Sequence, residues 1–303
     1  MTAIALVTAD ACVEDDLDMP PLLEACRIQS IDVEVCAWDD PRVDWSQYGA
    51  VVLRSPWDYV DRIAQFLAWC DHVSAVSELF NPLAAVRWSL DKHYLLDLAD
   101  RGIPVVPTRF IEPAHAPAAA VIDFLADFPQ AADFVIKPAI GCYSRGIQRF
   151  ARHQTDAAID HIAHLASNNA SVVLQPYLPA IDKTGETNLV FFDGVYSHAI
   201  CKSALLGQDG AVNVPTYDYR SPREADAAER TVATAALEAA RSHLGLRRPL
   251  LYARVDLIRG HDNTPRLLEL EIAEPSLSLP LTDKGATRFA QSLDRLVMVN
   301  QGA

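Results

Sequence analysis

The first quarter of the chain alternates short apolar runs with a segment of helical pattern. Apolar runs at 4–7 and 50–53 and an alternating run at 33–37 predict strands, and prolines 20 and 21 suit the first turn of a helix. Strands separated by helices are typical of a parallel sheet. No G-x-G-x-x-G follows the first strand, so the phosphate turn of a dinucleotide-binding fold is missing. We expect a small α/β domain over residues 1–85.

The next part of the chain predicts a second domain over residues 86–178. A helix is expected at 91–101, ended by Gly102, and a strand at 105–111. A linker at 112–120 leads into a further helix. Strands follow at 134–138 and 172–175, and a glycine loop at 141–146 comes directly after the first of them.

The remainder, residues 179–303, predicts a third domain built on hairpins. Strands at 189–192 and 195–202 flank Asp193-Gly194, a dipeptide typical of tight hairpin turns. A polar loop is expected over 204–221, and an alanine-rich helix over 224–244.

The stretch 250–276 carries the most informative pattern, because both of its halves alternate with period two. Arg254 and Asp256 share one face of the first half, and Glu269 and Glu271 share one face of the second. A turn composition lies between the halves. A hairpin folded symmetrically about 262–263 places Asp256 opposite Glu269 and Arg254 opposite Glu271.

Like charges directly opposite each other destabilise a sheet, so this face needs a cation. Oxygen ligands alone suit Mg²⁺, which commonly takes phosphate oxygens as further ligands. The alternative is a solvated hairpin face with one salt bridge. A one-residue slip in register would change the faces and remove the site.

Composition and charge narrow the class of protein. The chain has 303 residues, half of them hydrophobic and 22% charged, which is enough apolar material for a packed core. A net charge of −14 without a long basic run argues against nucleic acid and membrane surfaces as partners. The six cysteines form no C-x-x-C pair, and no apolar run is long enough for a membrane span. With no export signal at the start, we expect a cytoplasmic enzyme.

The glycine loop and the lysines suggest phosphate binding. Residues 141–146 match the first part of a P-loop, but Ile147 and Gln148 follow where that motif needs Lys and Ser or Thr. Glycines still let backbone N–H groups approach a phosphate closely. Lys92, Lys137 and Lys202 with Arg254 would form a sensible set of cations for Mg-ATP. The alternative is a flexible turn with solvated lysines.

Two further features stay ambiguous from the residues alone. The cluster Trp57-Asp58-Tyr59 after Arg54 is either a packed loop or a ligand site at the carboxyl end of a parallel strand. His198 is either a catalytic base or a histidine hydrogen-bonded for structure, and the second is more common.

The order of these motifs resembles the ATP-grasp superfamily over residues 80–280. The motifs are Asp91-Lys92, Val135-Ile136-Lys137-Pro138 with its glycine loop, Leu174-Gln175-Pro176-Tyr177-Leu178, Arg254-x-Asp256 and Glu269-x-Glu271. Within it, the chain looks most like the cyclo-ligases that act on O-ureido-D-serine in cycloserine biosynthesis. The motifs that carry this likeness are Arg54-Ser-Pro-Trp-Asp-Tyr59, Gly185-Glu186, Glu269-Leu-Glu271 and Glu274-Pro-Ser276.

The resemblance implies an ATP-grasp fold, in which an N-terminal parallel α/β domain precedes two subdomains that clamp ATP. It implies ATP contacts by Lys92, Lys137, Lys202, Gln175, Pro176, Tyr177, Leu178 and Glu186, under a flap that includes Gly141, Ser144, Arg145 and Gly146. It implies that Asp256, Glu269 and Glu271 ligate two Mg²⁺ ions, with Mn²⁺ as an alternative. Arg254 and Lys202 would be catalytic, at the oxyanion and the γ-phosphate. Substrate contacts would come from Arg54, Trp57, Asp58, Tyr59, Glu274 and Ser276.

The chain departs from the common pattern at two places. Many relatives carry asparagine where this chain has Glu271, and an added carboxylate should tighten metal binding unless Arg254 neutralises it. The flap carries Cys142, Tyr143 and Arg145, where relatives often have smaller residues.

The implied reaction is an ATP-dependent carboxylate–amine ligation through an acyl phosphate, on a small amino-acid-like carboxylate. Ring closure within one molecule, as with O-ureido-D-serine, would gain from proximity. The alternatives are a two-substrate amino-acid or peptide ligase of the glutathione-synthetase kind and a nucleotide-binding protein without chemistry. The sequence leaves open the substrate, the role of loop 204–221 and the oligomeric state, with a homodimer among the alternatives.

Overall fold

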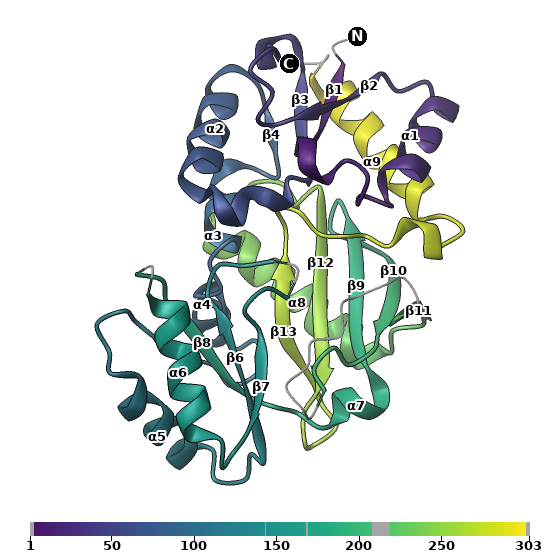
Figure 1. Ribbon diagram of the computed structural model, residues 1–303. Helices are drawn as coiled ribbons and strands as arrows, with labels where there is room; N and C mark the ends of the chain where they lie inside the picture. Colours follow the sequence, from purple (N-terminus) through teal and green to yellow (C-terminus); the bar gives the residue numbers. More distant parts are fainter. Residues whose placement is uncertain (1–2, 143, 168, 208–218, 301–303) are drawn as a thin grey trace.

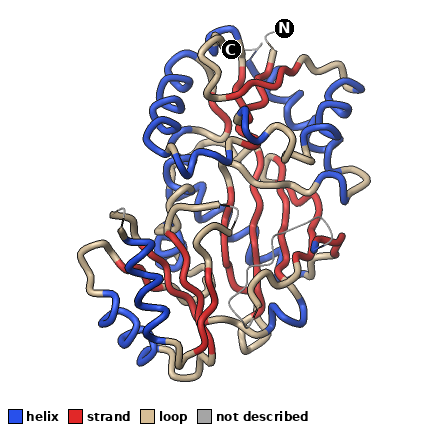
Figure 2. The backbone as a smooth tube through the Cα atoms, viewed as in Figure 1, coloured by secondary structure: helices blue, strands red, loops and turns tan. Residues whose placement is uncertain are grey.

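The computed structural model describes residues 3–142, 144–167, 169–207 and 219–300. Figure 1 shows three sheets: a parallel sheet at the top, a larger antiparallel sheet in the middle and a small antiparallel sheet at the lower left. The mixture of parallel α/β and antiparallel parts confirms the predicted fold class. Figure 2 shows that helices flank each sheet.

The top sheet has the strand order β2-β1-β3-β4, and all its pairs are parallel, as predicted. Ile4 and Leu6 pack toward α1, whereas Ala5 and Val7 pack toward α2, so both faces of β1 are buried. The elements of this part are β1 (Ile4–Thr8), η1 (Asp10–Cys12), α1 (Met19–Ile28), β2 (Val33–Ala37), η2 (Trp45–Gln47), β3 (Ala50–Ser55), η3 (Trp57–Asp61), α2 (Ile63–Val76), β4 (Leu79–Phe80) and α3 (Leu83–Ser89).

Helix α9 (Gly285–Asn300) returns from the end of the chain to pack against α1 beside this sheet, as Figure 1 shows in yellow and purple. Phe289 is fully buried in the same core as Ile4 and Leu22, and η5 (Leu279–Leu281) leads into it. The division at 1–85, 86–178 and 179–303 stays a prediction, and part of the last range packs on the first.

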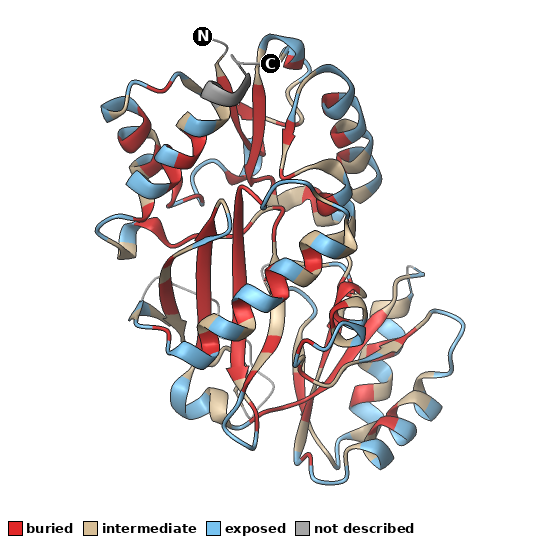
Figure 3. Cartoon of the chain, turned by 180° about the vertical axis from the view of Figure 1, so that it is seen from behind, coloured by how far each residue is buried: buried red, intermediate tan, exposed pale blue. Residues whose placement is uncertain are grey.

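The middle sheet has the order β11-β10-β9-β12-β13 and is antiparallel. Its apolar face, including Ala253 and Val255, packs on α8 and α4, and Figure 3 shows α8 crossing this face with an exposed outer side. The predicted hairpin at Asp193-Gly194 is confirmed, with Val195 opposite Phe192. The elements are α4 (Tyr94–Asp100), α7 (Ala180–Thr184), β9 (Glu186–Phe192), β10 (Val195–Lys202), β11 (Arg220–Arg223), α8 (Ala227–His243), β12 (Tyr252–Arg259) and β13 (Pro265–Glu271).

The small sheet has the order β5-β8-β6-β7. Phe134 and Ile136 face α5 and α6, so the alternate residues Val135 and Lys137 point to the opposite side, toward the middle sheet. The elements are β5 (Arg109–Ile111), α5 (Pro117–Asp127), β6 (Asp133–Pro138), β7 (Gln148–Ala151), α6 (Thr155–Ala166) and β8 (Val172–Pro176).

Several predicted boundaries differ from the structure. The strand expected at 105–111 begins only at Arg109, because prolines 104 and 107 cannot donate to a ladder. The helix expected at 91–101 begins at Tyr94, since the Asp91 carboxylate accepts the backbone N–H of His93 at 3.1 Å in a turn that holds Lys92. The loop expected at 204–221 overlaps β11 from Arg220 onward, and 208–218 lie outside the described residues.

Candidate active site

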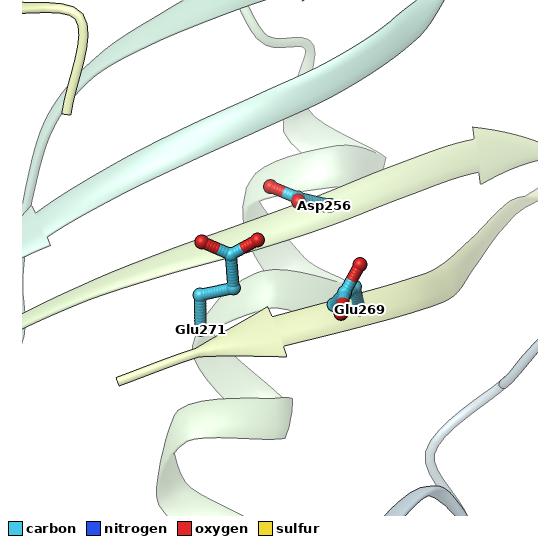
Figure 4. A group of neighbouring side chains, drawn as sticks. All are labelled: Asp256, Glu269 and Glu271. Carbon is cyan, nitrogen blue, oxygen red and sulfur yellow. The ribbon is translucent and has the colours of Figure 1, made fainter. Parts of the chain in front are cut away.

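The carboxylate hairpin has the predicted register at its functional positions. Arg254 lies opposite Glu271 and Asp256 opposite Glu269, whereas a bulge after Asp256 brings Leu257 opposite Leu267. Each of the three carboxylates offers an oxygen, and these oxygens lie within 4.8 Å of one another. Figure 4 shows the three side chains turned toward one another across the two strands. The alternative of a solvated face is wrong for Asp256, which is 1% exposed.

Arg254 crosses the same face and holds two of the carboxylates. Its Nε and Nη2 donate to the two oxygens of Asp256, each at 2.8 Å, and Nη2 also donates to Glu271. Burial lowers the pKa of Arg254, but the negative charges of Asp256 and Glu271 outweigh it and hold the pKa well above its usual value. The guanidinium therefore stays charged and offsets part of the acidic cluster.

Repulsion among the three carboxylates, which Arg254 offsets only in part, fits a divalent cation. Burial raises the pKa of Glu271 to about 8, because Arg254 offsets only part of that effect while Asp256 and Glu269 add to it. Burial also raises the pKa of Glu269, but Lys92 and Lys137 reverse the shift and lower it to about 2. A site built from carboxylate oxygens that repel one another suits Mg²⁺ or Mn²⁺. The donor set thus fits the predicted metal.

The three predicted lysines come together on this face. Lys92 Nζ lies 2.9 Å from Glu269 Oε1 and donates to the carbonyl of Gly141 at 3.1 Å. Lys202 Nζ lies 3.8 Å from Glu186 Oε1. Burial lowers the pKa of Lys137 to about 8, with the neighbouring lysines adding to the effect. Cations from the turn before α4, from β6 and from β10 therefore face the carboxylates of β13.

A cavity of about 820 Å³ joins these groups. Most of the predicted site residues line it: Lys92, Lys137, Gly141, Ser144, Arg145, Gln175, Pro176, Tyr177, Leu178, Glu186, Lys202, Arg254, Glu269, Glu271, Trp57, Tyr59, Glu274 and Ser276. Asp256 belongs to the carboxylate cluster, and Arg54, Asp58 and Gly146 do not line the cavity.

One end of the cavity is apolar and was missed by sequence reasoning. Val106, Ile258 and Leu268 line it and pack with Leu178 in one small cluster. Gln175 donates from Nε2 to Thr108 Oγ1 at 2.9 Å, which orients its amide. These apolar residues lie in no motif, so only the folded chain brings them together.

The opposite end lies against the N-terminal sheet. The Trp57 indole donates to the Glu274 carbonyl at 2.9 Å, and the Tyr59 hydroxyl is hydrogen-bonded to the Glu274 carboxylate. Ser276 Oγ accepts from Arg220 Nη1 at 2.8 Å. Arg220 lines the cavity and was not singled out from the sequence, although it lies in the stretch 204–221 that was predicted as a polar loop.

Arg54, Asp58 and His198 serve the scaffold. Arg54 is fully buried between the Tyr252 and Phe289 rings and donates to the Pro275 carbonyl at 3.3 Å. Asp58 accepts the Trp38 indole N–H at 2.8 Å. His198 Nε2 lies 2.8 Å from the Leu277 carbonyl, and burial lowers its pKa to about 4, which fits the structural interpretation.

The flap spans the space between the lysines and the N-terminal sheet. Gly146 has φ +70, and a Cβ there would lie 2.9 Å from Leu165, so this position requires glycine. Cys142 Sγ donates to the Trp57 carbonyl at 3.2 Å, and Arg145 Nη1 lies 2.7 Å from Asp61. Tyr143 lies outside the described residues. The described part of the flap therefore contacts residues 57–61, the same segment whose Trp57 and Tyr59 contact Glu274.

Comparison with known proteins identifies the family. The sequence model of the D-cycloserine synthetase DcsG N-terminal domain matches residues 4–81. The chain is 53% identical over 293 residues to the cycloserine biosynthesis protein DcsG of Streptomyces lavendulae, covering 97% of this chain and 98% of that protein. The chain belongs to the DcsG family of ATP-grasp ligases. The crystal structure of D-cycloserine synthetase DcsG matches with a TM-score of 0.94 over 97% of this chain and 99% of that one, at 53% identity.

More distant structures share the ATP-grasp fold of the DcsG family. D-alanyl-alanine synthetase A from Vibrio cholerae matches over the full length of both chains with a TM-score of 0.72 at 13% identity. The ATP-grasp ligase PsnB, in a complex with Mg and ADP, matches with a TM-score of 0.64 at 18% identity, over 98% and 99% of the two chains. The predicted ATP-grasp fold is thereby confirmed, and the match to DcsG confirms the C–N ligase class. Within the described residues, no helix is both long and apolar enough to cross a bilayer.

Proposed function

We propose that this ligase closes a ring within one amino-acid molecule, forming the D-cycloserine ring from O-ureido-D-serine or a close analogue with Mg-ATP. The observation that carries the chemistry is the cluster of Asp256, Glu269 and Glu271 facing three lysines across one cavity. The observation that carries the substrate is 53% identity to DcsG along nearly the whole chain.

The first step forms a bond from the substrate carboxylate to the γ-phosphorus, and ADP leaves. Lys137 and Lys202 line the cavity, and their ammonium groups would contact phosphate oxygens, while Lys92 joins the flap to Glu269. Two Mg²⁺ ions held by the three carboxylates would offset charge on the transferring group. The flap excludes water, which protects the acyl phosphate from hydrolysis.

The second step forms the amide bond. The nitrogen bonded to the side-chain oxygen of the same substrate attacks the acyl carbon, phosphate leaves, and the nitrogen loses a proton. The ring then still carries the carbamoyl group, and hydrolysis of that group to CO2 and ammonia would complete D-cycloserine. Arg254 stabilises the oxyanion of the tetrahedral intermediate, since its guanidinium lines the cavity and stays charged. Because no second molecule must be captured, ring closure gains the advantage of proximity.

The experiment is product analysis by mass spectrometry with Mg-ATP and a panel of amino acids. We expect ADP release that requires O-ureido-D-serine, with a product smaller than the substrate. A product enlarged by one residue would instead indicate the two-substrate ligase. ATP binding without ADP release on any carboxylate would indicate a binding protein and overturn the proposal.

A further inference from the structure

The cavity continues past the metal-ligand cluster toward the N-terminal sheet. Glu274 follows Glu271 by three residues, so an extended backbone carries it about 10 Å at most beyond the cluster. Two further carboxylates, Glu14 and Asp15, are exposed at the mouth of the same cavity. We call the region of Glu14, Asp15, Trp57, Tyr59 and Glu274 the acidic end.

Glu274 is held in place within this region. The Tyr59 hydroxyl donates to its carboxylate, and Tyr59 itself is 2% exposed. The Trp57 indole fixes the backbone of Glu274 through the 2.9 Å bond to its carbonyl. A carboxylate whose side chain is positioned by buried Tyr59 and whose backbone is positioned by half-buried Trp57 has little freedom to turn into solvent.

Among the described residues, no cation forms an ion pair with Glu274 at contact distance, although the charges of Lys92 and Arg254 act on it from farther away. Both of these cations already form ion pairs with other carboxylates. Lys92 pairs with Glu269, and Arg254 pairs with Asp256 and Glu271. Withdrawing a carboxylate from water without a cation is costly. The site is therefore matched to a positive group that arrives with a ligand.

The other carboxylates at this end indicate which charges the ligand carries. Glu14 and Asp15 repel a second carboxylate and attract a cation toward the mouth. Arg254, together with Mg²⁺ once the three carboxylates hold it, would attract the substrate carboxylate. An amino acid that has its ammonium group at Glu274 and its carboxylate toward Arg254 satisfies both charges.

We propose that Glu274, oriented by Tyr59, binds the α-ammonium group of the substrate and so determines which amino acids are accepted. This inference rests on the proposed function, because it assumes an amino-acid substrate whose carboxylate is activated at Arg254 and the metal. It adds that the specificity for an α-amino group comes from one carboxylate outside the phosphate and metal machinery.

The test compares O-ureido-D-serine with its des-amino analogue, 3-(ureidooxy)propanoate, on the full chain and on Glu274→Gln. For the parent protein we expect kcat/KM to fall about 100-fold when the amino group is absent, as for loss of a charge-assisted hydrogen bond. In Glu274→Gln, kcat/KM for the amino substrate should fall by a similar factor, mostly through a higher KM. The kcat/KM values of this variant for the two substrates should differ by less than about 5-fold.

Further variants separate this role from others. Tyr59→Phe should raise KM for the amino substrate about 5-fold and leave KM for ATP unchanged. Glu24→Gln, at an exposed pair with Arg27 on α1, serves as the matched surface control. Unchanged KM for ATP in Glu274→Gln shows that the nucleotide end is intact.

Two outcomes overturn the inference while leaving ring closure standing. One is a Glu274→Gln protein that still prefers the amino substrate as strongly as the parent. The other is a fall in kcat on both substrates alike with KM unchanged, which would make Glu274 a proton acceptor. If the parent protein itself releases no ADP with O-ureido-D-serine, the proposed function fails instead.

Discussion

Arg54 and Asp18 form a buried ion pair, with 3.8 Å between Nη2 and Oδ2 and side chains 0% and 1% exposed. Asp18 also accepts the backbone N–H groups of Leu277 at 2.6 Å, Ser278 at 3.2 Å and Leu279 at 2.6 Å. The start of α1 is thereby joined to the segment that follows Glu274 and Ser276. Arg54 also donates to the Pro275 carbonyl at 3.3 Å, and its predicted contact with substrate stays a prediction.

Asp18→Ala should destabilise the protein by about 3–5 kcal/mol, because it leaves the Arg54 charge buried without its partner. Urea unfolding measures this free energy. Asp40→Ala, which removes an exposed pair with Arg42, is the matched control and should cost less than about 1 kcal/mol. A loss for Asp18→Ala no larger than that control would contradict the structural role.

Asp256→Asn should reduce turnover by about 1000-fold or more and raise the Mg²⁺ concentration needed for half-maximal rate. The change removes one charged ligand from the cluster while keeping the size of the side chain. Steady-state kinetics across Mg²⁺ concentrations measures both effects, and circular dichroism checks that the fold remains. A variant with parental activity would remove the metal-site assignment.

Glu271 should make Mg²⁺ binding depend on pH. Its pKa is raised to about 8 in the metal-free protein, so below that pH the metal must displace a proton, and affinity should rise as pH increases toward 8. Glu271→Asn introduces the residue that many ATP-grasp proteins carry there. It should keep turnover, weaken Mg²⁺ binding and flatten this pH dependence in a calorimetric titration; an unchanged slope would refute the assignment.

Lys137 should make ATP binding depend on pH in the opposite direction. Its pKa is lowered to about 8, so the free protein carries the ammonium below that pH and loses it above. Phosphates favour the charged form, so binding above pH 8 takes up a proton, and affinity should fall as pH increases. Lys137→Arg keeps the charge at all these pH values. Fluorescence titration with an ATP analogue should show that its affinity no longer falls above pH 8.

Local sequence pattern was sufficient to predict which residues of the carboxylate hairpin lie opposite each other. Period-two alternation and a turn composition fixed which residues face each other, so Asp256–Glu269 and Arg254–Glu271 could be paired from the sequence. The bulge after Asp256 has no such signal, because one extra residue leaves the alternation on both sides intact. Lys92 was placed in a helix because the turn made by Asp91 precedes the helix without a break in pattern.

The parts of the site that could not be predicted depend on contacts between distant residues. The pairing of Asp18 with residues 277–279 joins positions about 260 residues apart, as the hydrogen bonds show. The apolar end formed by Val106, Ile258 and Leu268 likewise combines three elements. No local pattern encodes which buried surfaces meet. Hydrophobic burial alone specifies them, and it acts only in the folded chain.

The packing of α9 on α1 also bears on how the protein is made. The face of the parallel sheet that carries Ile4 and Leu6 is covered in part by Phe289 and Leu293. During translation, this apolar face of the parallel sheet therefore stays partly uncovered until nearly the whole chain has left the ribosome. A fragment that stops before α9 would expose that face to aggregation, so a shortened form of the protein needs to keep the last helix.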